Sequence, residues 1–280
     1  MRYTLKNSLI GNFFLAAGQV KIKTREEEIE VKDGAVTVLG LDSHSIQDLS
    51  PLAGLTKLTR LNLSENKISN LKPLAGLTEL KFLNLSKNKI KDLSPLAGLT
   101  KLTSLGLWEN RIIDLSPLAG MTELESLALW ENKVVDLLPL AGLKNLMSLY
   151  LSRNKISNLL PLASLKRLDS LYLDRAKVSD LSPLAELINL TELYLSENKI
   201  SDLSPLAGLK DLWCLNLVDN KISDLSPLAK LKTLTVLNLM NNAVKDLSPL
   251  AGLTKLNTLG LGNDKIDRSP LAKLKDLKIF

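Results

Sequence analysis

Residues that could carry out catalysis are few in this sequence of 280 residues. The only histidine is His44, so sites built from several histidines are excluded. A serine followed three residues later by a lysine, the spacing of a serine hydrolase motif, occurs at Ser64 and Lys67, Ser86 and Lys89, Ser152 and Lys155, and Ser196 and Lys199. A catalytic motif needs to occur once, so these regular copies indicate a structural role. We expect no enzymatic activity, no metal site and no cofactor.

The aromatic side chains form a second candidate set, because they recur at related positions. Trp108 and Trp130 occupy the same place in the similar segments LGLWENRIIDLSPLAG and LALWENKVVDLLPLAG. The aromatic residues between positions 30 and 279 are Phe82, Trp108, Trp130, Tyr150, Tyr172, Tyr194 and Trp213. The elements that position these rings must therefore repeat as well.

The repeat is defined by proline. All eleven prolines follow one constant spacing, which shortens only at the last copy. They stand at positions 51, 73, 95, 117, 139, 161, 183, 205, 227, 249 and 270. One unit reads LxxLxxLxLxxNxIxxLSPLAG, as in residues 55–76. Near-identical units of this length predict a solenoid, in which each coil stacks on the next.

Each unit contains signals for one short strand and one short turn of helix. The alternation in Leu61, Asn62 and Leu63 is typical of a strand with one buried face. Ser-Pro, as in Ser94 and Pro95, predicts a serine N-cap and a proline at the first helical position. Only a few residues remain before the next leucine, which favours a 3₁₀ turn. We expect leucine, isoleucine and valine to fill the interior.

An asparagine follows most of the predicted strands. It stands at positions 66, 88, 110, 132, 154, 198, 220 and 242, and Ala176 takes its place in one copy. A buried amide can donate and accept hydrogen bonds together, which suits a sharp turn with inward-facing backbone groups. We expect these side chains to form a ladder of hydrogen bonds.

These motifs resemble the leucine-rich repeat family in its 22-residue subclass, and the phrase DLSPLAGL resembles bacterial internalin-type repeats. The resemblance covers residues 36–280, with eleven repeats. It implies an α/β solenoid arc, with a parallel sheet on the concave face and short 3₁₀ or helical turns on the convex face. Internalin-type proteins grip host proteins with an aromatic-rich concave face.

Both ends of the predicted solenoid need covers. Residues 1–35 are predicted to form an N-terminal cap, with a hairpin turn at Asp33 and Gly34. Residues 1–19 fit either an amphipathic helix of this cap or a weak export signal, and both interpretations stay open. At the other end, Leu277 and Phe280 match the opening of a twelfth strand, so the chain either was cut from a longer one or is shielded there by lysines.

The aromatic residues fall beside the leucines of the predicted strands, where side chains point out of the core onto the concave face. None of these seven aromatic residues occupies a leucine position, which argues against a role in the core; strand propensity is the competing explanation. Strands about 4.8 Å apart spread the seven rings over about 29 Å, too long for a small-molecule pocket. The predicted partner is a protein or extended peptide. Glu109, Glu131, Arg153 and Arg175 are predicted to orient it at the rim.

The net charge of +6 does not predict a nucleic-acid partner. Lysines after the asparagines are followed in most copies by an aspartate three residues later, as in Lys89 and Asp92. This spacing predicts a solvent-exposed edge that carries both positive and negative charges. No apolar stretch is long enough for an integral membrane segment. Cys214 is the only cysteine; we expect it to face outward as an exposed thiol beside Trp213. We expect a monomer.

The leading hypothesis is a protein-binding module that acts in adhesion or recognition. Three alternatives stay open: an intracellular scaffold or regulatory subunit, the recognition arm of a larger effector enzyme, and an engineered repeat scaffold. The module would be secreted or lie at the cell surface if it is internalin-like, and in the cytoplasm if it is a scaffold. The sequence does not identify the partner.

Overall fold

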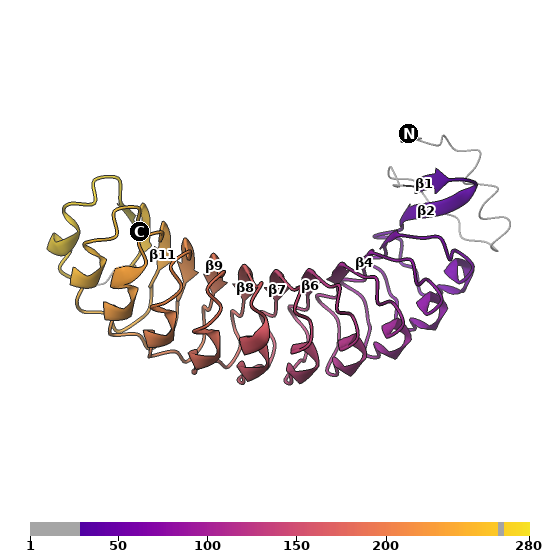
Figure 1. The fold of residues 1–280 in the computed structure, drawn as a ribbon, viewed down its shortest axis with the longest axis horizontal. Helices are drawn as coiled ribbons and strands as arrows, with labels where there is room; N and C mark the ends of the chain where they lie inside the picture. The colour runs from indigo at the N-terminus through magenta and orange to yellow at the C-terminus, as the bar shows by residue number, and fades with distance from the viewer. Residues whose placement is uncertain (1–28, 263–265) are drawn as a thin grey trace. The chain divides into compact units, whose positions relative to one another are not determined.

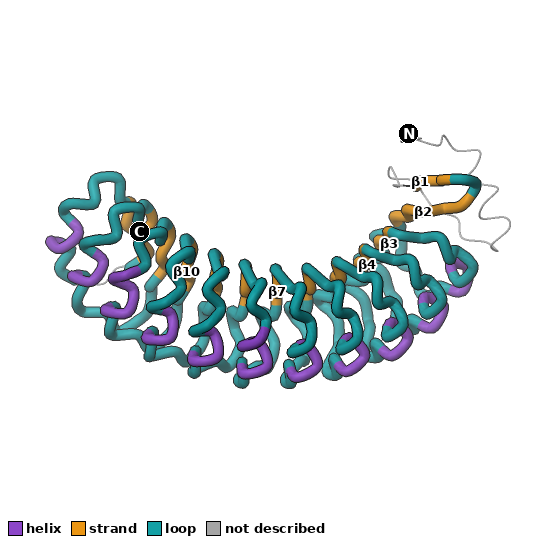
Figure 2. The backbone as a smooth tube through the Cα atoms, viewed as in Figure 1, coloured by secondary structure: helices purple, strands orange, loops and turns teal. Residues whose placement is uncertain are grey.

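The computed structural model describes residues 29–262 and 266–280 of the chain. The chain divides into two compact units, residues 1–132 and 133–280, and each unit is described by itself. In both, short strands line one side and 3₁₀ turns the opposite side (Figures 1 and 2). No helix among the described residues is long and apolar enough to cross a membrane. The predicted helix in residues 1–19 lies outside the described residues.

The first unit begins with a hairpin and continues as a stack of coils. Its strands are β1 (Ile29–Lys32), β2 (Ala35–Gly40), β3 (Arg60–Asn62), β4 (Phe82–Asn84), β5 (Ser104–Gly106) and β6 (Ser126–Ala128). Its 3₁₀ turns are η1 (Ser50–Leu52), η2 (Lys72–Leu74), η3 (Ser94–Leu96) and η4 (Ser116–Leu118). β1 and β2 are antiparallel, and β2 to β6 pair in parallel, each with the next. The predicted turn at Asp33 and Gly34 is confirmed, since both have the positive φ that such a hairpin needs.

The second unit repeats the coil without a hairpin. Its strands are β7 (Ser148–Tyr150), β8 (Ser170–Tyr172), β9 (Glu192–Tyr194), β10 (Cys214–Asn216), β11 (Val236–Asn238), β12 (Thr258–Gly260) and β13 (Lys278–Ile279), which pair in parallel in this order. Its 3₁₀ turns are η5 (Leu138–Leu140), η6 (Leu160–Ser164), η7 (Ser182–Leu184), η8 (Ser204–Leu206), η9 (Ser226–Lys230), η10 (Ser248–Leu250) and η11 (Ser269–Leu271). The predicted fold class, a leucine-rich repeat solenoid, is confirmed.

The register of the strands follows from the repeat length. Leu61 pairs with Leu83, and Leu83 pairs with Leu105, so each residue meets its equivalent in the next repeat. The central leucine of each such strand is buried, while most of the flanking residues face outward and are half-buried. Because successive side chains of a strand point to opposite faces, the coil buries its leucines and holds the residues between them on the outer face of the sheet. We call this outer face the strand face.

The last strand has a different spacing from the others. A strand does begin there, as the match of Leu277 and Phe280 predicted: β13 pairs Leu259 with Ile279. Leu259 and Ile279 are 20 residues apart, whereas the paired leucines Leu237 and Leu259 are 22 apart, so the last coil is two residues shorter. Phe280 follows β13 and is exposed over 54% of its surface.

The 3₁₀ turns are as predicted, but their caps are not. In the 3₁₀ turns of the described residues, no serine side chain acts as the N-cap; the N-cap of η3, for example, is Leu93, and Ser94 follows as the first residue of the turn. Asp92 accepts a hydrogen bond of 2.8 Å from the Ser94 N–H. This contact recurs at most 3₁₀ turns, where an aspartate two residues ahead binds the freed backbone N–H. The aspartates predicted to offset the lysines therefore also hold the beginnings of the 3₁₀ turns.

The asparagine ladder is present, and its bonds go to the backbone. The amide nitrogen of Asn88 donates to the Leu63 carbonyl of the preceding coil and to the Leu85 carbonyl of its own coil, both at 3.0 Å. Its Oδ1 accepts the Ile68 N–H at 2.8 Å. One side chain thus satisfies turns of two adjacent coils, which fixes how the coils stack.

Candidate binding face

In the first unit, two tryptophan rings stack on the strand face. Trp108 and Trp130 stand two residues beyond β5 and β6, at equivalent positions of neighbouring coils. Their ring centroids are 4.4 Å apart, with an angle of 8° between the ring planes. Because adjacent strands lie about 4.8 Å apart, side chains at equivalent positions are spaced for face-to-face contact. Both rings remain half-buried.

Cations cover two aromatic faces of the same unit. The Arg60 guanidinium carbon lies 3.9 Å from the centroid of the Phe82 ring, and Lys87 Nζ lies 4.9 Å from that of Trp108. Lys87 also forms a 2.8 Å ion pair with Glu65, which helps to hold it over the ring. The aromatic residues of this unit are thus accompanied by positive charge.

In the second unit, three tyrosines stack in a row. Tyr150, Tyr172 and Tyr194 end strands β7, β8 and β9, and β-sheet pairing sets them side by side. Their centroids are 4.6 Å apart for the first pair and 4.4 Å for the second. We call these three residues the tyrosine stack. All three are half-buried, with part of each ring in contact with solvent.

The hydroxyls of two of these tyrosines reach toward the next coil. Tyr172 donates a 2.6 Å hydrogen bond to Glu192 Oε2. Burial, followed by the contact with the negative Glu192, raises the pKa of Tyr172 well above its usual value. The hydrogen bond with Cys214, followed by burial, raises the pKa of Tyr194. Both phenols therefore stay protonated at neutral pH.

The prediction of an exposed Cys214 thiol is wrong. Cys214 lies on the strand face, but only 5% of it is exposed, and its sulfur lies 3.4 Å from the Tyr194 hydroxyl. The tyrosine side chain reaches across to the neighbouring strand and helps to cover the thiol. This burial raises the pKa of Cys214, which lowers its reactivity.

The seven predicted aromatic residues do not occupy one position in the repeat. Phe82 is the first residue of β4, the tyrosines are the last residues of their strands, and the tryptophan pair follows the strands. Trp213 directly precedes β10 and is exposed over 40% of its surface. The structure brings together the tryptophan pair and the tyrosine stack, whereas Phe82 and Trp213 contact no other aromatic ring among the described residues.

The predicted rim residues lie in the turn that follows each strand, just before the asparagine position. Their backbones have positive φ values: 51° at Glu109, 55° at Glu131, 57° at Arg153 and 53° at Arg175. Residues other than glycine rarely have a backbone in this left-handed conformation. Arg175 forms a 2.6 Å ion pair with Glu197 of the next coil. These turns fix where the rim charges stand beside the strand face.

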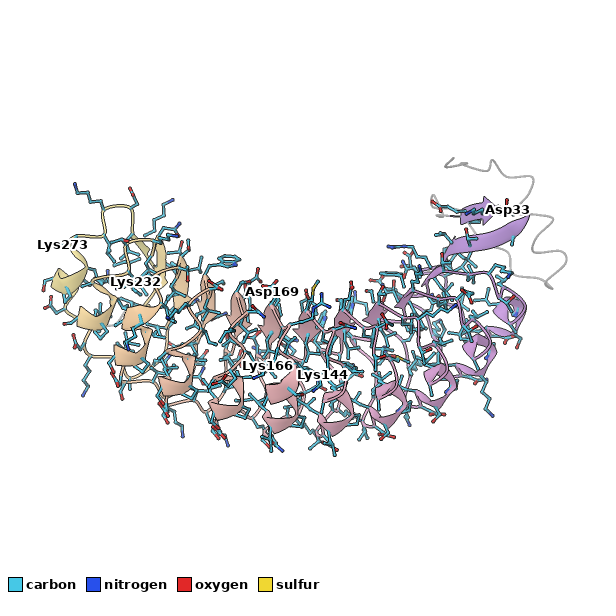
Figure 3. The ribbon with its side chains drawn as sticks, in the orientation of Figure 1. Asp33, Lys144, Lys166, Asp169, Lys232 and Lys273 are labelled. Atoms are coloured by element: carbon cyan, nitrogen blue, oxygen red, sulfur yellow. The ribbon has the colours of Figure 1, made fainter. Side chains whose placement is uncertain are left out.

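Three acidic residues near the tyrosine stack were not among the predicted site residues. Asp169 precedes β8, Asp174 follows it, and Glu192 begins β9. Asp169 extends from the strand side of the second unit (Figure 3). The sequence contained a signal for them, because most neighbouring copies have serine, threonine or an apolar residue at the same positions.

Models of leucine-rich repeats match most of the chain. A model of two repeat copies matches residues 78–120, 188–230 and 232–278, a further one matches 35–90, and a single-repeat model matches 145–166. The solved structure of the internalin InlF from Listeria monocytogenes is 37% identical, with a TM-score of 0.74, over 87% of this chain and 86% of that chain. The chain belongs to the leucine-rich repeat family. It is an internalin-like leucine-rich repeat protein of bacterial type.

Two further solved structures are also similar to this leucine-rich repeat protein. Internalin C2 of L. monocytogenes is 38% identical, with a TM-score of 0.55, over 74% of this chain and 82% of that chain. The ectodomain of the receptor kinase GASSHO1/SCHENGEN3 from Arabidopsis thaliana, solved in complex with CASPARIAN STRIP INTEGRITY FACTOR 2, is 23% identical, with a TM-score of 0.73, over 83% of this chain and 30% of that chain. The latter likeness shows the fold alone. No curated protein matches the sequence.

Membership of this family makes the chain a protein-binding repeat module. Leucine-rich repeat proteins and internalins are typically non-enzymatic. Among the described residues, no group of three or more histidine, cysteine, aspartate or glutamate side chains is placed to hold a metal ion.

Proposed function

We propose that the strand face of this internalin-like protein binds a protein or extended peptide through its aromatic residues. The observation that supports this most is the incomplete burial of the tryptophan pair and the tyrosine stack. The core of each coil is filled by leucines that are almost fully buried, so the rings are not needed there. Solvated rings on a rigid sheet are suited to contact with a partner.

The size of the aromatic surface fits a macromolecular partner. A large aromatic side chain buries about 150 to 250 Å², and a standard interface buries about 800 Å² per partner. Because most of the rings are already half-buried, they supply only part of such a surface, and the residues beside them on the strand face supply the rest. The asparagine ladder and the buried leucines hold the strands in place, so little ordering of the backbone accompanies binding.

The rim residues are proposed to orient the partner. Glu109, Glu131, Arg153 and Arg175 lie in turns beside the strands and include both signs of charge. Charges at the edge of an interface affect the association rate and the orientation more than the affinity. We expect the rings to supply most of the affinity.

The test is affinity capture from extracts with the parent chain and with the Trp130→Ser, Tyr172→Ser double variant. We expect the variant to keep its circular dichroism spectrum, because neither side chain belongs to the leucine core, and to lose the captured partners. The matched control is Ile113→Ser, Leu160→Ser. These two apolar residues are exposed by 61% and 67% and lie away from the strand face.

The control should retain the partners, since it removes exposed apolar surface elsewhere on the chain. Capture of every partner by the strand-face variant would refute the proposed function. Loss of the partners by both variants would point to general stickiness of exposed apolar residues.

A further inference from the structure

The strand face of the second unit is acidic around the tyrosine stack. The four outward positions in each coil from β7 to β12, equivalent to residues 169, 170, 172 and 174 of the β8 coil, include Asp169, Asp174 and Glu192 but no lysine or arginine. The whole chain carries a net charge of +6. These acids therefore run against the overall charge of the protein.

Neutral groups occupy the hydrogen-bonding sites of all three carboxylates. Asp169 Oδ1 accepts from the Thr191 hydroxyl at 2.6 Å, and Glu192 Oε2 accepts from the Tyr172 hydroxyl at 2.6 Å. Asp174 Oδ1 accepts the Ser196 N–H at 2.8 Å, and its Oδ2 accepts from the Ser152 hydroxyl at 3.2 Å.

These bonds orient the carboxylates without cancelling their charge. Arg175, the cation just beyond Asp174, is held by Glu197 at 2.6 Å. Among the described residues, no lysine or arginine forms an ion pair with any of the three acids. A cationic group arriving from a partner would find oriented acceptors.

The geometry points to a basic partner segment on the tyrosine stack, with one arginine or lysine side chain directed at Asp174 and another at Glu192, which begins β9 level with Ser170. This inference rests on the proposed function and specifies the chemistry of the partner. The aliphatic stem of such a side chain packs on apolar ring surface while its charged head reaches an acid. The tyrosine stack offers the apolar ring surface, and the flanking carboxylates offer the acid. An acidic segment or a phosphate backbone would be repelled at the same place.

The first step of the test is to select displayed random peptides against the full chain. Peptides are retained for analysis if they bind the parent and fail to bind the Tyr150→Ser, Tyr172→Ser variant. We expect the retained peptides to be enriched in arginine and lysine.

The second step measures the affinity of these peptides for the Asp169→Asn, Asp174→Asn, Glu192→Gln variant. The amide side chains keep the hydrogen-bond acceptors that Thr191, Ser196 and Tyr172 use, so the fold and the stack should persist. We expect binding to weaken about tenfold or more, and its dependence on salt to become shallower. The matched control is Glu123→Gln, Glu186→Gln, Asp211→Asn, which makes the same change in net charge at positions outside the strand face.

The outcomes separate this inference from the proposed function. Peptides that need the tyrosines but lack basic residues, or that bind the charge variant as well as the parent, would overturn the inference and leave the proposed function intact. Equal weakening by the control variant would also overturn it, because net charge rather than this surface would be responsible. If no selected peptide depends on the tyrosines, both the inference and the binding role of the stack fail.

Discussion

The hydroxyl of Tyr172 donates a 2.6 Å hydrogen bond to Glu192, which begins the neighbouring strand. The Tyr172 ring is at the same time stacked between Tyr150 and Tyr194. This one side chain therefore links the aromatic surface to the acidic residues beside it. The same contacts make the stability of the protein sensitive to high pH.

We predict that the free energy of unfolding falls as the pH rises above 10. The folded state raises the pKa values of Tyr172 and Tyr194 above the ordinary value of 10.0. Above that pH the unfolded chain releases protons that the folded chain retains, so unfolding is favoured. Urea unfolding between pH 8 and pH 11 should show a shallower loss in the Tyr172→Phe, Tyr194→Phe variant than in the parent. Equal slopes would contradict the prediction.

The stacked tryptophans are predicted to stabilise each other. Stacked aromatic pairs contribute about 0.5 to 1.5 kcal/mol beyond the surface they bury. A double-mutant cycle of Trp108→Ala and Trp130→Ala, measured by urea unfolding, should give a coupling energy in that range. The control cycle combines Trp130→Ala with Phe82→Ala, two rings without mutual contact. It should give a coupling near zero, and similar values for the two cycles would contradict a specific stacking effect.

The Ala176→Asn variant is predicted to be more stable than the parent. Asn198 Oδ1 accepts the Val178 N–H of the preceding coil, whereas Ala176 offers no such acceptor to the Ile156 N–H. That N–H has no hydrogen-bond partner among the described residues, and Ile156 is fully buried. Restoring the amide should raise the free energy of unfolding by about 1 to 2 kcal/mol.

The matched control for this prediction is Asn198→Ala, which should lower the free energy of unfolding by about 1 to 3 kcal/mol. If Ala176→Asn leaves stability unchanged or reduces it, the interpretation of the gap is wrong. Partner affinity should be measured as well. Higher stability with unchanged affinity would identify Ala176 as a neutral sequence change that the repeat tolerates. Reduced affinity would indicate that a looser turn assists binding.

The left-handed turn residues predict a strong dependence on side-chain shape. Glu109 has a φ of 51°. Most residues other than glycine lose about 1 to 2 kcal/mol of conformational free energy in this left-handed backbone conformation. A β-branched residue fits this conformation worst, so Glu109→Ile should destabilise the protein by about 1 to 2 kcal/mol or more, while Glu109→Asn should be neutral or stabilising. Glu125→Ile, at an exposed position without a positive φ, is the control and should have a small effect. Equal losses at both positions would refute the role of backbone conformation.

Acid should destabilise the protein through the aspartates that cap the 3₁₀ turns. The hydrogen bonds from the Ser116 hydroxyl and N–H hold the pKa of Asp114 below its ordinary value of 3.8, and Asp92 and Asp246 behave alike. A depressed pKa contributes stability above the unfolded value, which is lost as the pH falls through the folded value. Melting temperature should therefore drop as the pH falls below about 4.

The Asp114→Asn variant tests the contribution of a single cap. It retains an acceptor for the Ser116 N–H but no longer titrates, so its melting temperature should depend less on pH between 5 and 2.5. An unchanged pH profile would show that this cap contributes nothing measurable to acid sensitivity.

The spacing of residues along the chain was enough to predict the solenoid. Evenly spaced prolines and leucines in alternation determine the coil length, the parallel register and the face on which each strand residue lies. Phe82, Tyr150, Tyr172 and Tyr194 could therefore be assigned to the strand face from the sequence alone. The asparagine ladder was predictable for the same reason, because an inward turn needs a side chain that donates and accepts.

The contacts between coils required the tertiary structure. The backbone of Tyr172 pairs with Tyr194, and that of Tyr194 pairs with Asn216. Their hydroxyls instead reach Glu192 and Cys214, each two residues before the paired position. The repeat length gives the neighbour of a backbone position, but the length and lean of a side chain decide which residue it touches. For this reason the sequence predicted the outward positions correctly, yet missed the burial of Cys214 and the carboxylates beside the tyrosine stack.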